Sequence, residues 1–242
     1  MTILRTVLAA ALGLTALGAL AADADPAVAE RIRAAVAEVE PRIEIDAVGE
    51  TPLPGIYEVV IGGQVAYLSG DGKYLVQGNI IELGSGRSVS DERRGELRLA
   101  KLEESVDESQ MIIYEPGGEV STQITVFTDI DCPYCRKMHA DIEQMLAEGV
   151  RVRYLLMPRA GVGSGSYVKA VNAWCADDPR AALTAAKQGK RNEQRECDDP
   201  VTKHLRLARD LGITATPTII LEDGRVEAGY RDFATLKRAL DL

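Results

Sequence analysis

The sequence has no excess of positive charge and, after its first residues, no long apolar run and no internal repeat. It contains 28 lysine and arginine residues against 37 aspartate and glutamate residues, so the formal net charge is −9 at pH 7. This balance argues against a general nucleic-acid-binding protein. Histidine is scarce, with 2 residues in 242, and this limits the metal sites that the chain can build.

The first residues have the pattern of an export signal. Arg5 is followed by an uncharged apolar run from Val7 to Leu20, which ends in the small-x-small triplet Ala19-Leu20-Ala21. We therefore expect residues 1–21 to be a cleaved signal peptide. The alternative is a membrane anchor, but this run is short for a bilayer and no later segment is long enough.

Residues 22–84 are expected to form a small α+β domain. Apolar residues recur at helical spacing from Val28 to Val39, and short β-rich runs follow. The expected strands are 43–48, 56–61, 65–68 and 74–83, with Asp71-Gly72 as a hairpin signal before the last. A domain of this size buries little apolar surface, so we expect it to pair with a second copy.

Residues 85–106 are charged and helix-favouring, and we expect them to form a linker helix. Gly95 inside this stretch weakens the helical pattern, and the alternative is that the helix belongs to a flanking domain. Residues 107–242 are expected to form an α/β domain. Its expected elements are strand 123–127, helix 132–148, strand 150–157, helical stretch 166–211, strands 218–221 and 226–230, and a last helix from 233. This order, with a CxxC motif at a helix start and a late Thr-Pro before a strand, indicates a thioredoxin-like layout.

The motif that carries chemistry is Cys132-Pro133-Tyr134-Cys135. Disulfide exchange needs a thiolate nucleophile and a second thiol that resolves the mixed disulfide. A helix N-terminus favours a thiolate through its partial positive charge and free N–H groups, and Pro133 suits the first helical position. We expect Cys132, at the exposed end, to be the nucleophile and Cys135, one turn inside, to be the shielded resolving thiol.

Charged residues beside the motif act in opposite directions. Arg136 and Lys137 favour a thiolate at Cys132, whereas Asp131 disfavours it by like-charge repulsion. Because the sequence does not give their geometry, their net effect stays open at this stage.

Other uses of the motif fit the sequence less well. A zinc site needs more ligands at suitable spacing, and Cys175 and Cys197 form no second CxxC. Arg136 follows the motif where haem attachment requires His. His139 is expected to be a solvated or packing residue, and not the partner of a protease-type cysteine. We expect no metal and no cofactor.

Several segments extend the pattern beyond the CxxC motif. They are FTDIDCPYC (127–135) with KMH (137–139), VRYL (152–155) with PR (158–159), AWCA (173–176), GITATP (212–217) and GKYLVQG (72–78). Together they resemble the bacterial periplasmic disulfide isomerases of the DsbC/DsbG family, and the likeness covers nearly all of the chain after residue 21. The combination is specific, and its overall character is closer to DsbC.

The resemblance implies a V-shaped homodimer held by small, cystatin-like N-terminal domains. Each is joined by the linker helix to a thioredoxin-like catalytic domain with a helical insertion, which makes the fold class α+β. Misfolded or oxidised exported proteins are the expected clients, bound in an apolar cleft, and a membrane protein like DsbD is the expected electron donor. The expected location is the periplasm.

The resemblance also implies roles for individual residues. Thr216 and Pro217 match the family's loop beside the active site, where the proline is cis, and they are expected to contact substrate together with Pro133 and Tyr134. Cys175 and Cys197 match the family's structural disulfide. The alternative for these two cysteines is a second redox relay.

The dipeptide between the active cysteines leaves the precise reaction open. DsbC has Gly at the first of these positions, whereas Pro133-Tyr134 resembles DsbG. Our first hypothesis is a periplasmic disulfide isomerase. The alternatives are a DsbG-like reductase of sulfenylated cysteines on folded proteins, and a chaperone-like binding dimer whose cysteines matter little.

Overall fold

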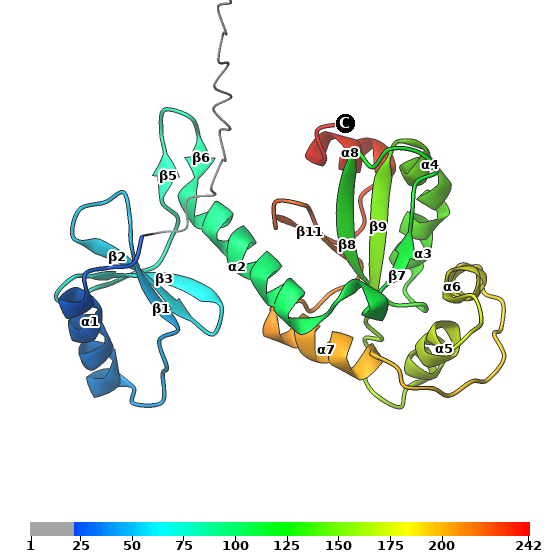
Figure 1. Ribbon diagram of the computed structural model, residues 1–242, viewed down its shortest axis with the longest axis horizontal. Helices are drawn as coiled ribbons and strands as arrows, with labels where there is room; N and C mark the ends of the chain where they lie inside the picture. Colours follow the sequence, from blue (N-terminus) through cyan, green and yellow to red (C-terminus); the bar gives the residue numbers. More distant parts are fainter. Residues whose placement is uncertain (1–21) are drawn as a thin grey trace, which may run out of the picture.

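The computed structural model describes residues 22–242 as two α+β units joined by one helix (Figure 1). The predicted signal peptide lies outside the described residues. In the N-terminal unit, helix α1 lies against a four-stranded antiparallel sheet of order β1-β2-β3-β4. The bounds are α1 Pro26–Val39, β1 Ala47–Glu50, β2 Ile56–Ile61, β3 Gln64–Ser69 and β4 Leu75–Val76.

Local sequence explains how α1 begins and which face it buries. The Asp25 carboxylate accepts a hydrogen bond from the backbone N–H of Ala27, and Pro26 occupies the first helical turn. Ile32 on its inner face is fully buried against Val59 and Leu68 of the sheet. The core of this unit is small, as the sequence predicts.

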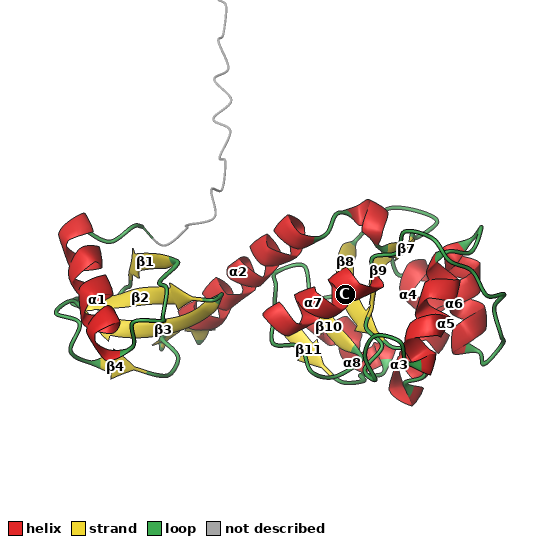
Figure 2. Ribbon diagram, turned by 90° about the horizontal axis from the view of Figure 1, so that it is seen from below, coloured by secondary structure: helices red, strands yellow, loops and turns green. Residues whose placement is uncertain are grey.

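A short hairpin leads from this sheet into the connecting helix. The hairpin consists of β5 (Ile81–Glu82) and β6 (Arg87–Ser88), and α2 (Val89–Ser105) follows directly with Ser88 as its N-cap. Arg93 of α2 forms an ion pair with Glu58 of β2, at 2.8 Å between Nε and Oε1. The first half of α2 is thereby attached to the N-terminal unit, while the second half reaches the C-terminal unit (Figure 2).

The C-terminal unit is a five-stranded sheet of order β11-β10-β8-β9-β7, in which only β8 and β9 are parallel. Its strands are β7 Ile112–Tyr114, β8 Thr122–Thr128, β9 Val150–Leu156, β10 Thr218–Ile220 and β11 Val226–Ala228. Its helices are α3 Pro133–Ala140, α4 Ile142–Ala147, α5 Gly165–Trp174, α6 Pro179–Lys187, α7 Val201–Asp210 and α8 Phe233–Ala239, with a short 3-10 turn at Glu108–Gln110. The parallel pair requires a crossover, and α3 with α4 supplies it.

Helices cover both faces of this sheet. Side chains of α3 to α6 and α8 pack on one face, around Val126 and Tyr154. The other face, around Phe127 and Leu155, is covered by α7 and by Leu102 of α2. Neighbouring residues of β8 and β9 therefore enter different cores, which explains the continuous apolar runs Val126-Phe127 and Tyr154-Leu155-Leu156 towards the ends of these strands. Among residues 22–242, no helix is long and apolar enough to cross a membrane.

The α+β class with a thioredoxin-like domain is confirmed, but several predicted elements differ. The expected helix 132–148 is broken at Asp141 into α3 and α4. The expected strand 74–83 is two short strands separated by a turn, and 43–48 forms a strand only from Ala47. The helical stretch 166–211 is three helices, with residues 190–200 outside any helix. Strand β7 was missed because three residues show no usable periodicity.

Gly95 explains how the second half of α2 fits against the sheet. A Cβ on Gly95 would lie 2.6 Å from the carbonyl oxygen of Asp223, in the turn between β10 and β11. Arg98, one turn further, donates a hydrogen bond to the carbonyl oxygen of Gly224 in the same turn. The glycine that weakened the helical pattern is thus the point where two backbones come into contact.

Replacing Gly95 by Ala should lower the free energy of unfolding by about 1–2 kcal/mol, because the added methyl overlaps backbone that has little room to move. Helix propensity alone predicts the opposite, a gain of about 1 kcal/mol. Urea denaturation separates the two. Gly84→Ala is the matched control, because a Cβ there meets no atom within 4 Å. A stabilised Gly95→Ala would contradict this packing.

Candidate active site

The two active-site cysteines lie where β8 ends and α3 begins. Cys132 is the N-cap residue of α3, and Pro133 occupies its first turn, as the sequence predicts. Both cysteines are free thiols, and both residues are 1% exposed. The expectation that Cys132 sits at an exposed end is therefore wrong for this structure. The physical reason is a loop from the far end of the chain that packs over it.

That loop contains Thr216 and Pro217, which are joined by a cis peptide bond. The Cys132 thiol donates a hydrogen bond to the Thr216 carbonyl oxygen at 3.3 Å. Among the described residues, the buried Thr216 hydroxyl has no hydrogen-bond partner. It is therefore free to donate to a thiolate when one forms.

Hydrogen bonding and burial separate the pKa values of the two thiols. Burial raises the pKa of Cys132, but it is outweighed by the hydrogen bonds that a thiolate there would accept from the Cys135 backbone, the Thr216 and Cys135 side chains and the Tyr134 backbone, and the pKa is lowered. For Cys135, deeper in the core, burial dominates and raises the pKa, although the Lys187 charge opposes it. The arrangement favours the thiolate at Cys132.

Two of the four expected substrate residues are exposed and two are buried. Pro133 and Tyr134 reach solvent, and the Tyr134 side chain is 56% exposed; Thr216 and Pro217 are buried beside Cys132. The Tyr134 ring stacks on Tyr230, with 6.2 Å between ring centroids. Sequence reasoning missed Tyr230, because it comes from the loop after β11 and carries no local motif.

The charges around the motif are paired, and this changes the prediction for Asp131. Its carboxylate accepts from Lys169 of α5 at 2.7 Å and from Arg136 at 3.2 Å. Arg136 also donates to the Ile130 carbonyl, and the Lys137 ammonium lies 5.9 Å from the Tyr230 ring centroid. Asp131 is therefore largely neutralised, and its expected repulsion of the thiolate is weakened by a lysine that the local sequence could not place.

Both histidines are buried structural residues. His139 contacts the Tyr154 hydroxyl and the Thr184 hydroxyl, each at 3.0 Å, and burial lowers its pKa to about 3. It is a packing residue and not a solvated one. His204 accepts from the Leu156 N–H and donates to the Gln110 carbonyl oxygen. Within residues 22–242, no group of three or more His, Cys, Asp and Glu residues could hold a metal ion.

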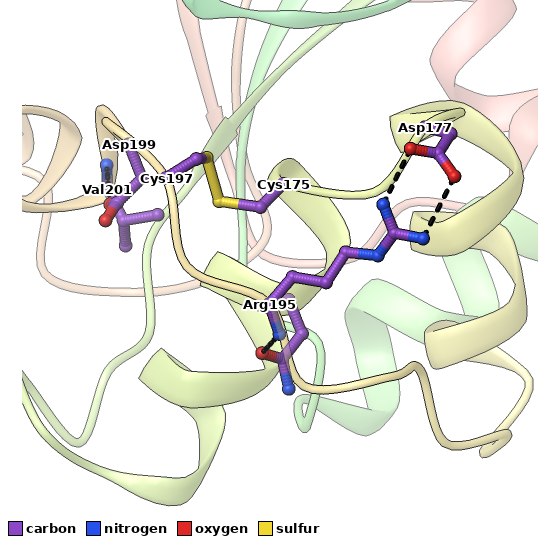
Figure 3. Close-up of a disulfide and its surroundings, with 7 residues drawn as sticks. Cys175, Asp177, Arg195, Cys197, Asp199 and Val201 are labelled. Carbon is purple, nitrogen blue, oxygen red and sulfur yellow. Dashed lines mark hydrogen bonds and ion pairs between the residues drawn. A yellow bond between two sulfur atoms is a disulfide. The ribbon is translucent and has the colours of Figure 1, made fainter.

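Cys175 and Cys197, 22 positions apart in the sequence, form a disulfide in the helical insertion. Figure 3 shows the bridge beside an ion pair between Arg195 and Asp177. The Arg195 guanidinium donates to both Asp177 oxygens, at 2.6 and 2.9 Å. Together these contacts fasten the non-helical residues 190–200 to the end of α5.

Known proteins match both units of the chain. The model for the disulfide bond isomerase protein N-terminal domain matches residues 19–91, and that for a thioredoxin-like domain matches residues 108–242. The thiol:disulfide interchange protein DsbC of Salmonella typhimurium is 34% identical over 191 residues, which cover 79% of this chain and 78% of the relative. The DsbC of Haemophilus influenzae is 35% identical and covers 79% of this chain and 81% of the relative.

This chain belongs to the DsbC family. The resemblance found in the sequence is thereby confirmed, and the chain is a thiol–disulfide oxidoreductase. A solved structure agrees with this: a disulfide interchange protein from Neisseria gonorrhoeae is 29% identical, with a TM-score of 0.51. The match covers 56% of this chain and 96% of that one.

The two charges of the Asp131–Lys169 ion pair should shift the pKa of Cys132 in opposite directions. Asp131→Asn should lower it and Lys169→Met should raise it, each by about half a pH unit, since both charges lie near the sulfur but are themselves partly exposed to solvent. The pH dependence of iodoacetamide alkylation measures both. Lys190→Met, at an exposed lysine of the insertion, is the control and should leave the profile unchanged. Shifts of equal sign in the two variants would contradict the assignment.

Removing the disulfide should cost stability and leave thiol chemistry intact. Cys175→Ala with Cys197→Ala should lower the free energy of unfolding by about 3 kcal/mol in the chain-entropy model for a loop of this length. Alkylation of Cys132 in the folded variant should proceed at the wild-type rate. Loss of Cys132 reactivity in a folded variant would instead support the alternative of a redox relay.

Proposed function

We propose that this member of the DsbC family is a periplasmic, homodimeric disulfide isomerase that rearranges incorrect disulfides in exported proteins. Cys132 is the nucleophile and Cys135 the resolving thiol. The observation that carries the proposal is the unequal environment of the two thiols at the start of α3, because an isomerase needs one stable thiolate and one reserve thiol.

The different environments of Cys132 and Cys135 give the two thiols different roles in the reaction. The Cys132 thiolate attacks a client disulfide, forms a mixed disulfide and releases one client thiolate. If another client thiolate attacks the mixed disulfide, a new client disulfide forms and the Cys132 thiolate returns. If Cys135 attacks Cys132 first, the client leaves reduced and the two active-site cysteines become a disulfide. A membrane reductase like DsbD would then have to restore the dithiol.

The surface near the motif suits clients of varied sequence. Tyr134 and Tyr230 provide aromatic surface beside the cysteines, and Pro133 lies at the same edge. Aromatic rings contribute area without demanding a particular hydrogen-bonding partner. In this proposal Thr216 and Pro217 contact the client chain next to the reacting sulfur.

An exposed apolar edge of the N-terminal unit supports the dimer. Strand β4 lies at the edge of its sheet, and Leu75 and Val76 are exposed on it. Tyr74 and Ile81 are exposed nearby, and Leu83 is 95% exposed. An apolar sheet edge is a template for pairing with another chain. A second copy that covers this edge would place two active sites in one assembly.

Recovery of a scrambled, multi-disulfide client in a fixed redox buffer tests the proposal. The wild type should restore native client, and Cys132→Ser should not. Equal recovery by both proteins would mean that binding, and not thiol exchange, is the activity. No recovery by a wild type with a reactive Cys132 would instead favour reduction of sulfenylated cysteines, the reaction suggested by the Pro133-Tyr134 dipeptide.

The same assay tests the dimer. Leu75→Glu with Leu83→Glu should give monomers in sedimentation that keep Cys132 reactivity but lose most of the client recovery. Val39→Glu is the matched control, since Val39 is also highly exposed but lies at the end of α1. Full recovery by a variant shown to be monomeric would contradict the role given to dimerisation.

A further inference from the structure

Lys187 is a buried cation near the active-site cysteines, and the proposed cycle gives it no role. It is the last residue of α6 in the helical insertion, and it is 4% exposed. Its ammonium donates a hydrogen bond to the Thr128 hydroxyl at 2.7 Å and lies 5.5 Å from the centroid of the Tyr154 ring. Lysine is rarely buried unless it is paired with a negative charge.

No ion pair accounts for this burial. Among the described residues, no carboxylate oxygen lies within the 4.0 Å that defines a salt bridge to the Lys187 ammonium. The Asp129 carboxylate, also buried, is paired instead with Arg159 at 3.3 Å. Asp129 therefore acts on Lys187 only from beyond ion-pair distance, and the other groups that can supply it with a negative charge are the active-site thiols when they ionise.

Hydrogen-bond polarity connects Lys187 to Cys135. A lysine ammonium has only donors, so the Thr128 oxygen must accept from it. The single Thr128 hydrogen is then left to donate, and the Thr128 hydroxyl acts to lower the pKa of Cys135. The Cys135 sulfur also accepts from the Asp129 N–H at 3.5 Å. Lys187 and Thr128 therefore both favour a thiolate at Cys135.

We propose that Lys187 stabilises the thiolate of Cys135 in the resolving step, both by its charge and by fixing the Thr128 hydroxyl as a donor. This deepens the proposed function, on which it rests, because it assigns an electrostatic group to the step that returns the client. The Cys135 thiolate supplies a counter-charge for the buried Lys187 ammonium. The ammonium in turn stabilises a thiolate that forms away from water.

The step balances without any further redox partner. In the mixed disulfide, the Cys135 thiol gives its proton to a base in solution, and the thiolate attacks the Cys132 sulfur. The bond between the two active-site sulfurs forms, and the bond from Cys132 to the client sulfur breaks. The client sulfur leaves as a thiolate and takes a proton from water. The client half-cystine is reduced, the active-site pair is oxidised, and Lys187 keeps its proton throughout.

The groups that face Lys187 allow it to act at neutral pH. Burial lowers its pKa to about 8, while Cys135, Asp129 and Cys132 raise it and Arg136 of α3 lowers it. A group with this pKa is mostly protonated at pH 7. The other titratable groups packed here stay neutral: burial lowers the pKa of His139 of α3 to about 3 and raises that of Tyr154 of β9 well above its ordinary value.

Lys187→Met tests the proposal, because it keeps the length of the side chain and removes its charge. The probe is the wild-type or variant protein with thionitrobenzoate in a disulfide with Cys132. Attack by Cys135 releases the coloured thiolate, so the rate of the resolving step is followed directly from pH 6 to 10. Lys190→Met, at the exposed lysine three residues further, is the matched control.

We expect slower release from Lys187→Met at pH 7 and convergence with the wild type at alkaline pH. Each unit by which the Cys135 pKa rises reduces its thiolate tenfold and increases its nucleophilicity about threefold, which leaves a net loss of about three- to fourfold. Thr128→Val should slow release in the same direction. Lys190→Met should match the wild type.

Identical pH profiles for the wild type and a folded Lys187→Met would overturn the proposal. So would a loss of rate that stays constant from pH 6 to 10, because the advantage of the wild type should disappear as Lys187 loses its proton with a pKa of about 8, whereas a structural defect would persist. If Lys187→Met does not fold, Thr128→Val decides by the same two criteria. The assay needs no protein client, so a failure of isomerase activity would leave its result unaffected.

Discussion

The hydrogen bonds offered to the Cys132 sulfur at the start of α3 are the interaction on which the rest of this site depends. A thiol buried in a protein normally resists ionisation, and burial alone would make both cysteines inert. The free N–H groups of the first turn reverse this for Cys132, and its pKa falls. Cys135 lies one turn deeper, where burial prevails and its pKa rises.

The rest of the fold positions the groups that make the pKa values of the two thiols differ. Strand β8 is buried on both faces, and its parallel pairing with β9 requires a crossover that begins with α3. The loop with Thr216 and Pro217, which is distant from Cys132 in the sequence, packs over it. The insertion brings Lys169 to Asp131 and Lys187 to Thr128, so two cations near the site come from helices remote in sequence. Its disulfide holds the segment that follows them.

The sequence allowed the chemistry to be predicted better than its surroundings. The CxxC motif, Pro133 at the first helical turn and the thioredoxin-like order of elements depend on local patterns, and local patterns are visible in a sequence. The burial of Cys132 depends on a loop 84 residues away, and the neutralisation of Asp131 depends on Lys169, 38 residues away. Lys190, three residues after Lys187, is exposed, and nothing in the local sequence distinguishes it from the buried Lys187. The role of Gly95 was likewise not visible in the sequence, because the reason for a glycine there is its close contact with the backbone of Asp223.

In the proposed function, one helix N-terminus separates two neighbouring thiols into a nucleophile and a reserve. Thiolate absorbance at 240 nm, followed during a pH titration of the reduced protein, measures this most directly. We expect a first thiolate that forms below the ordinary thiol value of about 8.5 and is absent in Cys132→Ser, and a second that forms above that value. Joint titration of both thiols near the ordinary value, or a first thiolate that persists in Cys132→Ser, would contradict it.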